Sequence, residues 1–140
     1  MTAREYLEQY KEACRRVNRY EREYRDESLL IDAVRSLSDN DGLPHGTGIS
    51  KPTEDKAVRL ADKMLKLIDA RLEAIAIRQE IFETVMLVGG LEADVLIERF
   101  LNDRTWEGVC EAVHYSWYAV NKAWHRGEDK LQTILDKSYK

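Results

Sequence analysis

The sequence has few of the residues that interrupt helices and few that build covalent frameworks. Among its 140 residues are 7 Gly, 2 Pro and 2 Cys. So little Gly and Pro excludes a loop-rich fold, while 44% hydrophobic residues are enough for a core. Cys14 and Cys110 lie far apart without a CxxC spacing, which argues against a disulfide scaffold and a thiolate metal site. We expect two reduced, buried side chains.

Long apolar runs and an excess of positive charge are missing too. No run approaches the roughly 20 residues of a membrane-spanning helix, and residues 1–10 are charged and polar where a signal peptide would be apolar. We therefore expect a soluble, cytoplasmic protein without a membrane partner. With 22 basic and 26 acidic residues the net charge is −4, so a nucleic-acid site has to be a local patch.

Residues 1–37 predict a long amphipathic helix, because apolar residues recur at intervals of three and four with charges between them. The helix also carries a basic stripe of Arg15, Arg19 and Arg22. Balancing carboxylates favour a solvated face over a phosphate contact for this stripe. The apolar positions are Ala3, Leu7, Tyr10, Cys14, Val17 and Tyr24, widened by Tyr6, Ala13 and Tyr20.

Residues 38–53 predict a linker, and residues 54–90 a second long helix. The linker collects three glycines and both prolines, which do not favour a helix. Thr53 can cap the helix that follows, and Gly89 and Gly90 can end it. The apolar stripe of this helix is Ala57, Ala61, Met64, Ile68, Leu72, Ile75, Phe82 and Val85.

The two apolar stripes need a cover that so short a chain does not otherwise provide. Pairing of the two helices as a hairpin, with a second protomer as a further cover, buries them. We therefore expect a homo-oligomer that forms through the N-terminal helices.

Residues 91–140 predict a module of three shorter helices, at 91–101, 106–113 and 117 to about 135. No stretch alternates with the period of two that marks a half-buried strand. The expected fold class is all-α, a long helical hairpin or coiled coil followed by a tri-helical module. The expected core of this module is Val95, Leu96, Phe100, Val109, Ala112, Val113, Val120, Trp124 and Leu131.

The last two helices have the layout of a helix-turn-helix unit, whose second helix enters the DNA major groove. Thr105 can cap the first helix, a turn follows at His114 and Tyr115, and Ser116 can cap the second. The residues of the second helix expected to face the core are Ala119, Val120, Ala123 and Trp124. Those turned outward are then Trp117, Tyr118, Asn121, Lys122, His125 and Arg126.

The outward residues suit duplex DNA. Asn121 can pair with adenine through two hydrogen bonds, and Lys122 can reach guanine or a phosphate. Thr105 lies at a helix N-terminus, where backbone N–H groups favour a phosphate. We expect base contacts from Tyr118, Asn121, Lys122 and His125. We expect phosphate contacts from Arg104, Thr105, Arg126 and Lys130.

Residues 91–131 resemble the fourth conserved region of bacterial sigma factors. The matching features are VLIERF from Val95, TWEGV from Thr105, the cap at Ser116, Val120 inside the recognition helix and Leu131. The upstream segment DGLPHGTGISKPTEDKAVRLAD, residues 41–62, joined to a helix and this module, is similar to small phage regulators of the RinA and ArpU type.

The resemblance implies a phage or prophage activator of late-gene transcription in the cytoplasm of a bacterial host. Such a protein acts by occupying a promoter and uses no cofactor, with RNA polymerase as a further partner. Two positions depart from the usual pattern: His114 stands where Gly is usual in the turn, and Gly127 stands inside the recognition helix. The module holds seven basic residues against nine carboxylates, so its own non-specific DNA affinity should be weak.

The alternatives to DNA binding are a metal site, an enzyme and a packaging adaptor or scaffold. Glu111 and His114 have the Glu-x-x-His form of carboxylate-bridged metal sites, but no second such motif exists, so we expect no metal. Glu80 and Glu83 resemble half of a magnesium motif in helical pyrophosphohydrolases and lack a second acidic pair, so we expect no enzyme. The main alternative is a phage DNA-packaging adaptor, like a small terminase, or another helical scaffold.

Overall fold

The computed structural model describes residues 1–39 and 51–138, with side chains at 1–34 and 54–138. Every regular element in these ranges is helical, which confirms the all-α class. None of these helices is both long and apolar enough to cross a membrane. The elements are α1 (Ala3–Asp39), α2 (Lys51–Met86), α3 (Gly90–Leu96), the π-helix η1 (Ile97–Leu101), α4 (Trp106–Val113) and α5 (Trp117–Ser138).

The chain divides into two compact units. Arg15–Leu72 is the hairpin unit, made of the later part of α1 and the earlier part of α2. Met1–Cys14 and Glu73–Lys140 together are the core unit, which holds the other parts of both long helices and all of the shorter ones.

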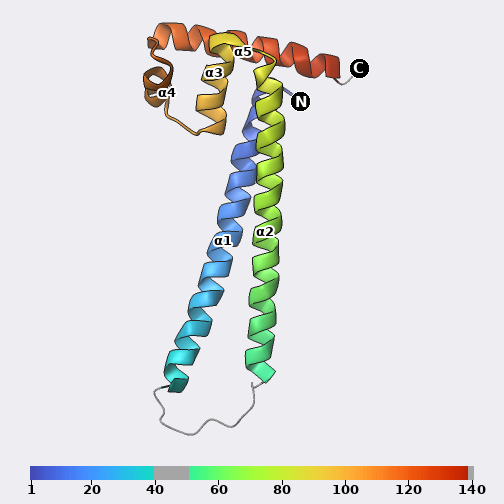
Figure 1. Cartoon of the computed structure of the whole chain (residues 1–140), viewed down its shortest axis with the longest axis vertical. Helices are drawn as coiled ribbons and strands as arrows, with labels where there is room; N and C mark the ends of the chain where they lie inside the picture. The colour runs from blue at the N-terminus through green and yellow to red at the C-terminus, as the bar shows by residue number, and fades with distance from the viewer. Residues whose placement is uncertain (40–50, 139–140) are drawn as a thin grey trace. The chain divides into compact units, whose positions relative to one another are not determined.

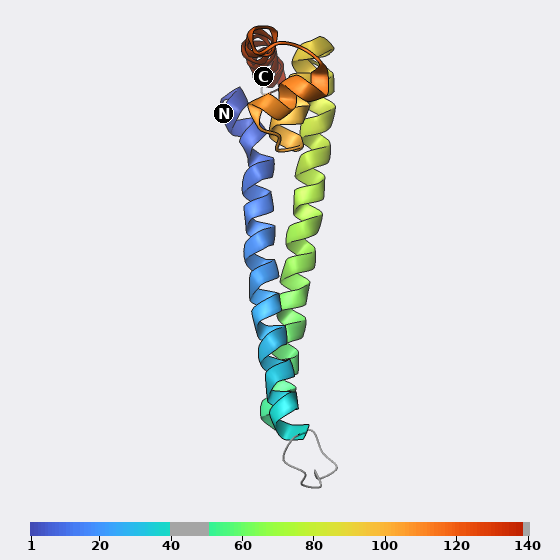
Figure 2. The ribbon, with the colours of Figure 1, turned by 90° about the vertical axis from the view of Figure 1, so that its left-hand side faces the viewer.

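In the hairpin unit, α1 and α2 lie side by side and run in opposite directions, and the views in Figures 1 and 2 agree on this. Leu67 is buried on α2. Beside it, Lys63 Nζ lies 3.3 Å from a carboxylate oxygen of Glu23 and 3.3 Å from one of Glu27. Hydrogen bonds to Glu23 and then to Glu27 raise the pKa of Lys63. The predicted hairpin of two long helices is confirmed.

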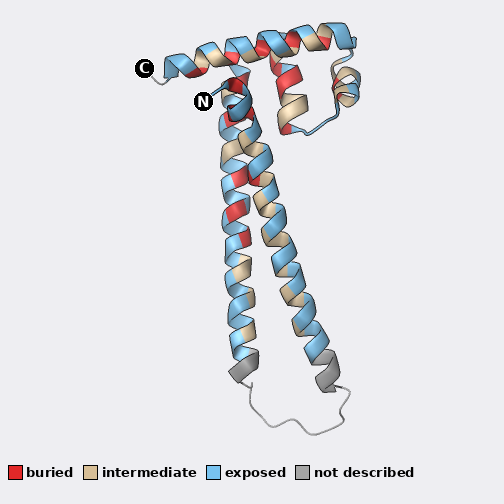
Figure 3. Cartoon of the chain, turned by 180° about the vertical axis from the view of Figure 1, so that it is seen from behind, coloured by how far each residue is buried: buried red, intermediate tan, exposed pale blue. Residues whose placement is uncertain are grey.

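The main apolar cluster of the core unit joins the first turns of α1, the last turns of α2, and α5. The Tyr6 hydroxyl donates to Thr84 Oγ1 at 2.9 Å, and the backbone N–H of Ala3 donates to Gln132 Oε1 at 2.7 Å. Figure 3 shows the buried residues of α3 and α5 in red. The buried members of the cluster are Ala3, Tyr6, Leu7, Ile81, Val85, Ala93, Leu96, Leu101, Leu131 and Leu135.

The face of α2 that lies inside differs from the predicted stripe. The side chains of Ile68, Leu72 and Ile75 are 41%, 59% and 64% exposed, and those of Ala57 and Ala61 are exposed as well. In the single chain, α1 does not cover these five positions of the predicted stripe. Two apolar faces on one helix satisfy the same helical period, so the pattern alone does not say which face meets α1. The residues of α2 that are buried are Leu67, Ala70, Ala74, Ile81 and Val85.

Only one of the two predicted ends of α2 agrees with the structure. The helix begins at Lys51, so Thr53 lies inside its first turn and the predicted cap there is wrong. Residues 40–50, which make up most of the predicted linker, lie outside the described residues. At the other end, Gly89 and Gly90 have φ of 71° and 63°, conformations that glycine adopts without a Cβ penalty. The predicted glycine break is confirmed.

The single helix predicted at 91–101 consists of two elements. α3 continues directly into η1, at whose end the Asn102 N–H donates to the Ile97 carbonyl at 3.0 Å, five residues back. The Arg104 N–H then donates to the Glu98 carbonyl at 3.1 Å. An apolar period does not distinguish an α-turn from a π-turn, so the π-helix η1 could not be predicted from the sequence.

Candidate nucleic-acid interface

α4 is followed by a short turn and then by α5, in the predicted order (Figure 1). Thr105 Oγ1 accepts a hydrogen bond from the Gly108 N–H at 3.1 Å, and Ser116 Oγ accepts one from the Ala119 N–H at 3.4 Å. Between them, His114 has φ 62° and ψ 39°, the left-handed conformation that ends α4. Both predicted caps and the predicted turn are confirmed.

A second apolar cluster holds these two helices on α3. Its buried residues are Val95, Val109, Val120 and Ala123. Trp124 is half-buried and packs against this cluster and the main cluster of the core unit. Three of the four residues predicted to face the core, Val120, Ala123 and Trp124, therefore do so, whereas Ala119 is half-buried and belongs to neither cluster. The burial of these three fixes which side of α5 remains outside.

The outer side of α5 carries the predicted base-contacting residues. Trp117 is 49% exposed and Tyr118 is 69% exposed. Lys122 and His125 are also exposed, whereas Asn121 is half-buried. The structure therefore brings the four predicted base-contacting residues onto two successive turns of one helix face.

Two of these side chains are held by aromatic rings. Lys122 Nζ lies 4.4 Å from the centre of the Tyr118 ring, a cation–π contact. The His125 ring stacks on Trp124 at 4.6 Å, with an angle of 25° between the planes. These contacts limit side-chain motion, which lowers the entropy cost of ordering them on a ligand.

Three of the four predicted phosphate-contacting residues already have a carboxylate partner. Arg104 pairs with Glu98. Arg126 Nε lies 3.8 Å, and Lys130 Nζ 3.3 Å, from the same oxygen of Glu92. The fourth residue, Thr105, uses its hydroxyl to cap α4. No local sequence pattern predicts these carboxylate partners.

Glu92 forms ion pairs with two cations of α5, Arg126 and Lys130. A hydrogen bond from its own backbone N–H, together with Lys130 and Arg126, holds the pKa of its carboxyl below the ordinary value. The carboxylate is therefore ionised near neutral pH and competes with any phosphate for both cations. Its side chain is only 14% exposed, whereas those of Arg126 and Lys130 are 62% and 53% exposed.

An aromatic cluster beside the turn was not predicted as a unit. The Trp106 ring lies 5.4 Å from the Trp117 ring and 4.4 Å from the Trp124 ring. The Arg99 guanidinium lies 4.6 Å from the Trp106 ring centre, and its Nη1 donates to the Arg104 carbonyl at 2.8 Å. The spacing of Trp117 and Trp124, two helical turns apart, was the available sequence signal.

A shallow hollow of about 460 Å³ opens beside this cluster. Cys110 borders it and is half-buried, as is Cys14, so the expectation of full burial is wrong while both thiols are free. Because three of the six lining residues are aromatic, the hollow is suited to an apolar side chain of a partner. Its lining residues are Trp106, Glu107, Cys110, Tyr115, Ser116 and Trp117.

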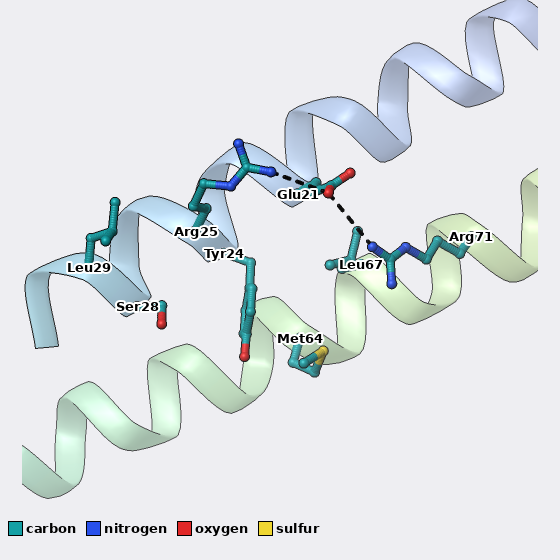
Figure 4. A pocket seen from close by; sticks show the side chains of 8 residues that line it. All are labelled: Glu21, Tyr24, Arg25, Ser28, Leu29, Met64, Leu67 and Arg71. Carbon is teal, nitrogen blue, oxygen red and sulfur yellow. Dashed lines mark hydrogen bonds and ion pairs between the residues drawn. The ribbon is translucent and has the colours of Figure 1, made fainter. Parts of the chain in front are cut away.

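The hairpin unit has a hollow of its own, of about 310 Å³, between α1 and α2 (Figure 4). Its two cations converge on one carboxylate: Arg25 lies 3.4 Å and Arg71 4.0 Å from Glu21 Oε1. Tyr24 and Met64 form part of its apolar lining. Glu21 neutralises one of the two positive charges and occupies both guanidinium groups, so they are not directed at an empty anion site.

The residues weighed for metal or catalytic chemistry do not converge. Glu80 and Glu83 are exposed, and Glu83 accepts a hydrogen bond from Gln79 at 2.9 Å. Glu111 and His114 are exposed on and just after α4. Over the described part of the chain, no three His, Cys, Asp or Glu side chains gather where they could hold a metal ion.

No protein-family model, curated protein or solved structure matches this chain.

Proposed function

We propose that this protein binds duplex DNA through the outer face of α5 and regulates transcription by occupying a promoter, as a phage or prophage late-gene regulator. The observation that carries the proposal is the capped α4, left-handed turn and α5 arrangement with Tyr118, Lys122 and His125 exposed on one face. A helix presented in this way fits the major groove.

Asn121 and Lys122 are the residues assigned to sequence reading. Asn121 pairs with an adenine edge and Lys122 with guanine or an adjacent phosphate. Tyr118 and His125 flank them along the helix and read neighbouring bases. Half-burial of Asn121 reduces the number of orientations that its amide can adopt, which favours one hydrogen-bonding geometry over several.

The phosphate contacts involve an exchange of partners. Arg126 and Lys130 leave Glu92 for phosphate, and Arg104 leaves Glu98, while Thr105 and the first N–H groups of α4 face the backbone. Each exchange subtracts the energy of an existing ion pair from the DNA contact. Affinity therefore depends on a second binding unit or on RNA polymerase as a co-binder.

Selection of bound duplexes from a random library, at low and near-physiological salt, tests the proposal. One motif should be enriched. On that duplex, Asn121→Ala should cost about 1–3 kcal/mol at its own base position and relax preference there. Lys122→Ala should weaken binding and reduce the salt slope by about 1.

Lys137→Ala is the matched control, because Lys137 is an exposed lysine in the last turn of the same helix. It should retain wild-type affinity and preference. Unchanged affinity and preference in both Asn121→Ala and Lys122→Ala would remove α5 from the groove.

The aromatic hollow favours a second candidate, a protein-binding adaptor of a packaging complex or a module that sits on RNA polymerase. Tyr115 and Trp117 are about half exposed at its rim, and exposed aromatic residues of this kind anchor protein interfaces. In this case no DNA motif is enriched, and Trp117→Ala abolishes capture of polymerase or of a terminase subunit while DNA binding remains absent.

A further inference from the structure

α2 has a second apolar face that the hairpin unit leaves uncovered. Val58, Leu65 and Leu72 are 60%, 59% and 59% exposed, and Ile68 between them is 41% exposed. Ala61 is exposed as well. By contrast Leu67, on the face of α2 turned to α1, is 2% exposed. A continuous row of exposed aliphatic side chains on one helix is unusual for a surface that meets only water.

The row has the spacing of a coiled-coil seam. Val58, Ala61, Leu65, Ile68 and Leu72 follow one another at intervals of three, four, three and four residues, the a and d positions of a heptad repeat. All five lie in the hairpin unit. At about 1.5 Å per residue the seam is about 21 Å long. Such a seam packs against another helix with the same repeat, and α2 of a second copy of this chain is such a helix.

We propose that two copies of the chain dimerise through this face of α2, with the two α2 helices parallel. In a parallel pair each seam residue meets its own counterpart, so Leu65 packs against Leu65 of the second copy and the layers above and below are also aliphatic. α1 covers the opposite face of each α2, so each α2 has one uncovered seam. The assembly closes as a dimer with two-fold symmetry.

The charges beside the seam select the parallel orientation. One rim is acidic, with Asp55, Asp62 and Asp69 at seven-residue intervals, and all three are exposed. The other rim carries Ala57, Met64 and Arg71 at the same intervals and no carboxylate. In an antiparallel pair the two acidic rims would face each other, whereas in a parallel pair each acidic rim faces the neutral and basic rim of the second copy.

The size of the seam predicts a weak dimer. A strip about 21 Å long and one helix wide, about 10 Å, covers less than the ~800 Å² per partner of a standard interface. We expect a dissociation constant in the micromolar range. This inference does not rest on DNA binding, and it is tested without DNA.

Sedimentation over a range of concentrations measures the dimer, and Leu65→Asp tests the seam. The variant should raise the dissociation constant at least tenfold while its helical content and Tm stay those of the monomer, because Leu65 is exposed there. Leu30→Asp is the matched control, since Leu30 on α1 is 63% exposed and lies outside the seam; it should dimerise like wild type. A monomer at every concentration, a larger assembly, or equal loss in both variants overturns the proposal.

Single cysteines test the orientation in a chain with Cys14 and Cys110 replaced by Ala. In the parallel dimer Ala61→Cys and Leu72→Cys, a d and an a position of the seam, should each form a disulfide-linked dimer with itself under mild oxidation. If neither variant cross-links alone and only a mixture of the two does, the helices are antiparallel and the proposed orientation is wrong.

Discussion

Gly127 stands in the middle of α5 because α3 passes too close to leave room for a side chain. A Cβ at this position would lie 3.1 Å from Leu96 Cδ1, 3.2 Å from Glu92 Cβ and 3.4 Å from the Glu92 carbonyl oxygen. Leu96 is fully buried, so it has little room to move. Gly127, which departs from the usual pattern of a recognition helix, is therefore the position at which α5 and α3 make close contact.

Gly127→Ala should destabilise the fold even though alanine is the better helix former. The gain in helix propensity is about 1 kcal/mol, and overpacking against α3 costs about 1–3 kcal/mol. We expect a net loss of about 1 kcal/mol and a Tm lower by about 3 °C in thermal unfolding. Thr133→Ala, at an exposed position of the same helix, should leave Tm unchanged or raise it. A rise in Tm for Gly127→Ala would contradict the close contact.

At His114 the local turn, and not a neighbouring helix, determines the backbone conformation. Its φ of 62° is a conformation that costs most residues about 1–2 kcal/mol and that Gly adopts freely. The sequence identified this position as a turn from the capping residues on either side of it, and the left-handed conformation follows from that turn. Here local sequence determines the backbone, and at Gly127 a neighbouring helix does.

At the scale of elements, Glu92 links the first turn of α3 to the outer side of α5. It holds Arg126 and Lys130 together, and because these cations and its own backbone N–H lower its pKa, it remains ionised near neutral pH. The same two cations are the proposed phosphate contacts. In the proposed complex, these ion pairs would therefore set how much positive charge α5 offers to DNA.

Glu92→Gln should strengthen DNA binding, because it releases both cations from a competing carboxylate. We expect affinity for the selected duplex to rise about fivefold at low salt, with a salt slope steeper by about 1–2, in a fluorescence titration. Asp129→Asn is the control, since it removes one negative charge from an exposed position of α5 without breaking an ion pair among the described residues. An equal gain in both variants would mean that only net charge matters.

Helices, caps and turns could be predicted from the sequence because they depend on neighbours within four or five residues. Thr105, Ser116 and the glycine pair at residues 89–90 are of this kind. The sequence does not show which apolar face of α2 meets α1, since Leu67 and Ile68 belong to two apolar faces of equal period. The ion pairs of Glu92 depend on a contact between α3 and α5 that has no local sequence signal. For the tryptophan cluster, the two-turn spacing of Trp117 and Trp124 is visible in the sequence, whereas the contact that Trp106 of α4 makes with them is not.

For the whole molecule, the net charge of −4 means that the proposed DNA binding has to rely on a few local contacts. Three of the cations assigned to phosphate are paired in the free chain, so one copy of α5 should bind weakly. Two copies joined through α2 would bind two half-sites, and the second contact then occurs at a high effective concentration. Weak binding by each single copy of α5 is therefore compatible with specific binding by the dimer.

Amide hydrogen exchange of the unmodified protein, with and without a saturating amount of the selected duplex, tests the DNA-binding face most directly. We expect slower exchange over residues 105–126, from the start of α4 to the middle of α5, and no comparable change over residues 15–34 of α1. A bound duplex that leaves exchange over residues 105–126 unchanged, or a protein that binds no duplex, would contradict the account.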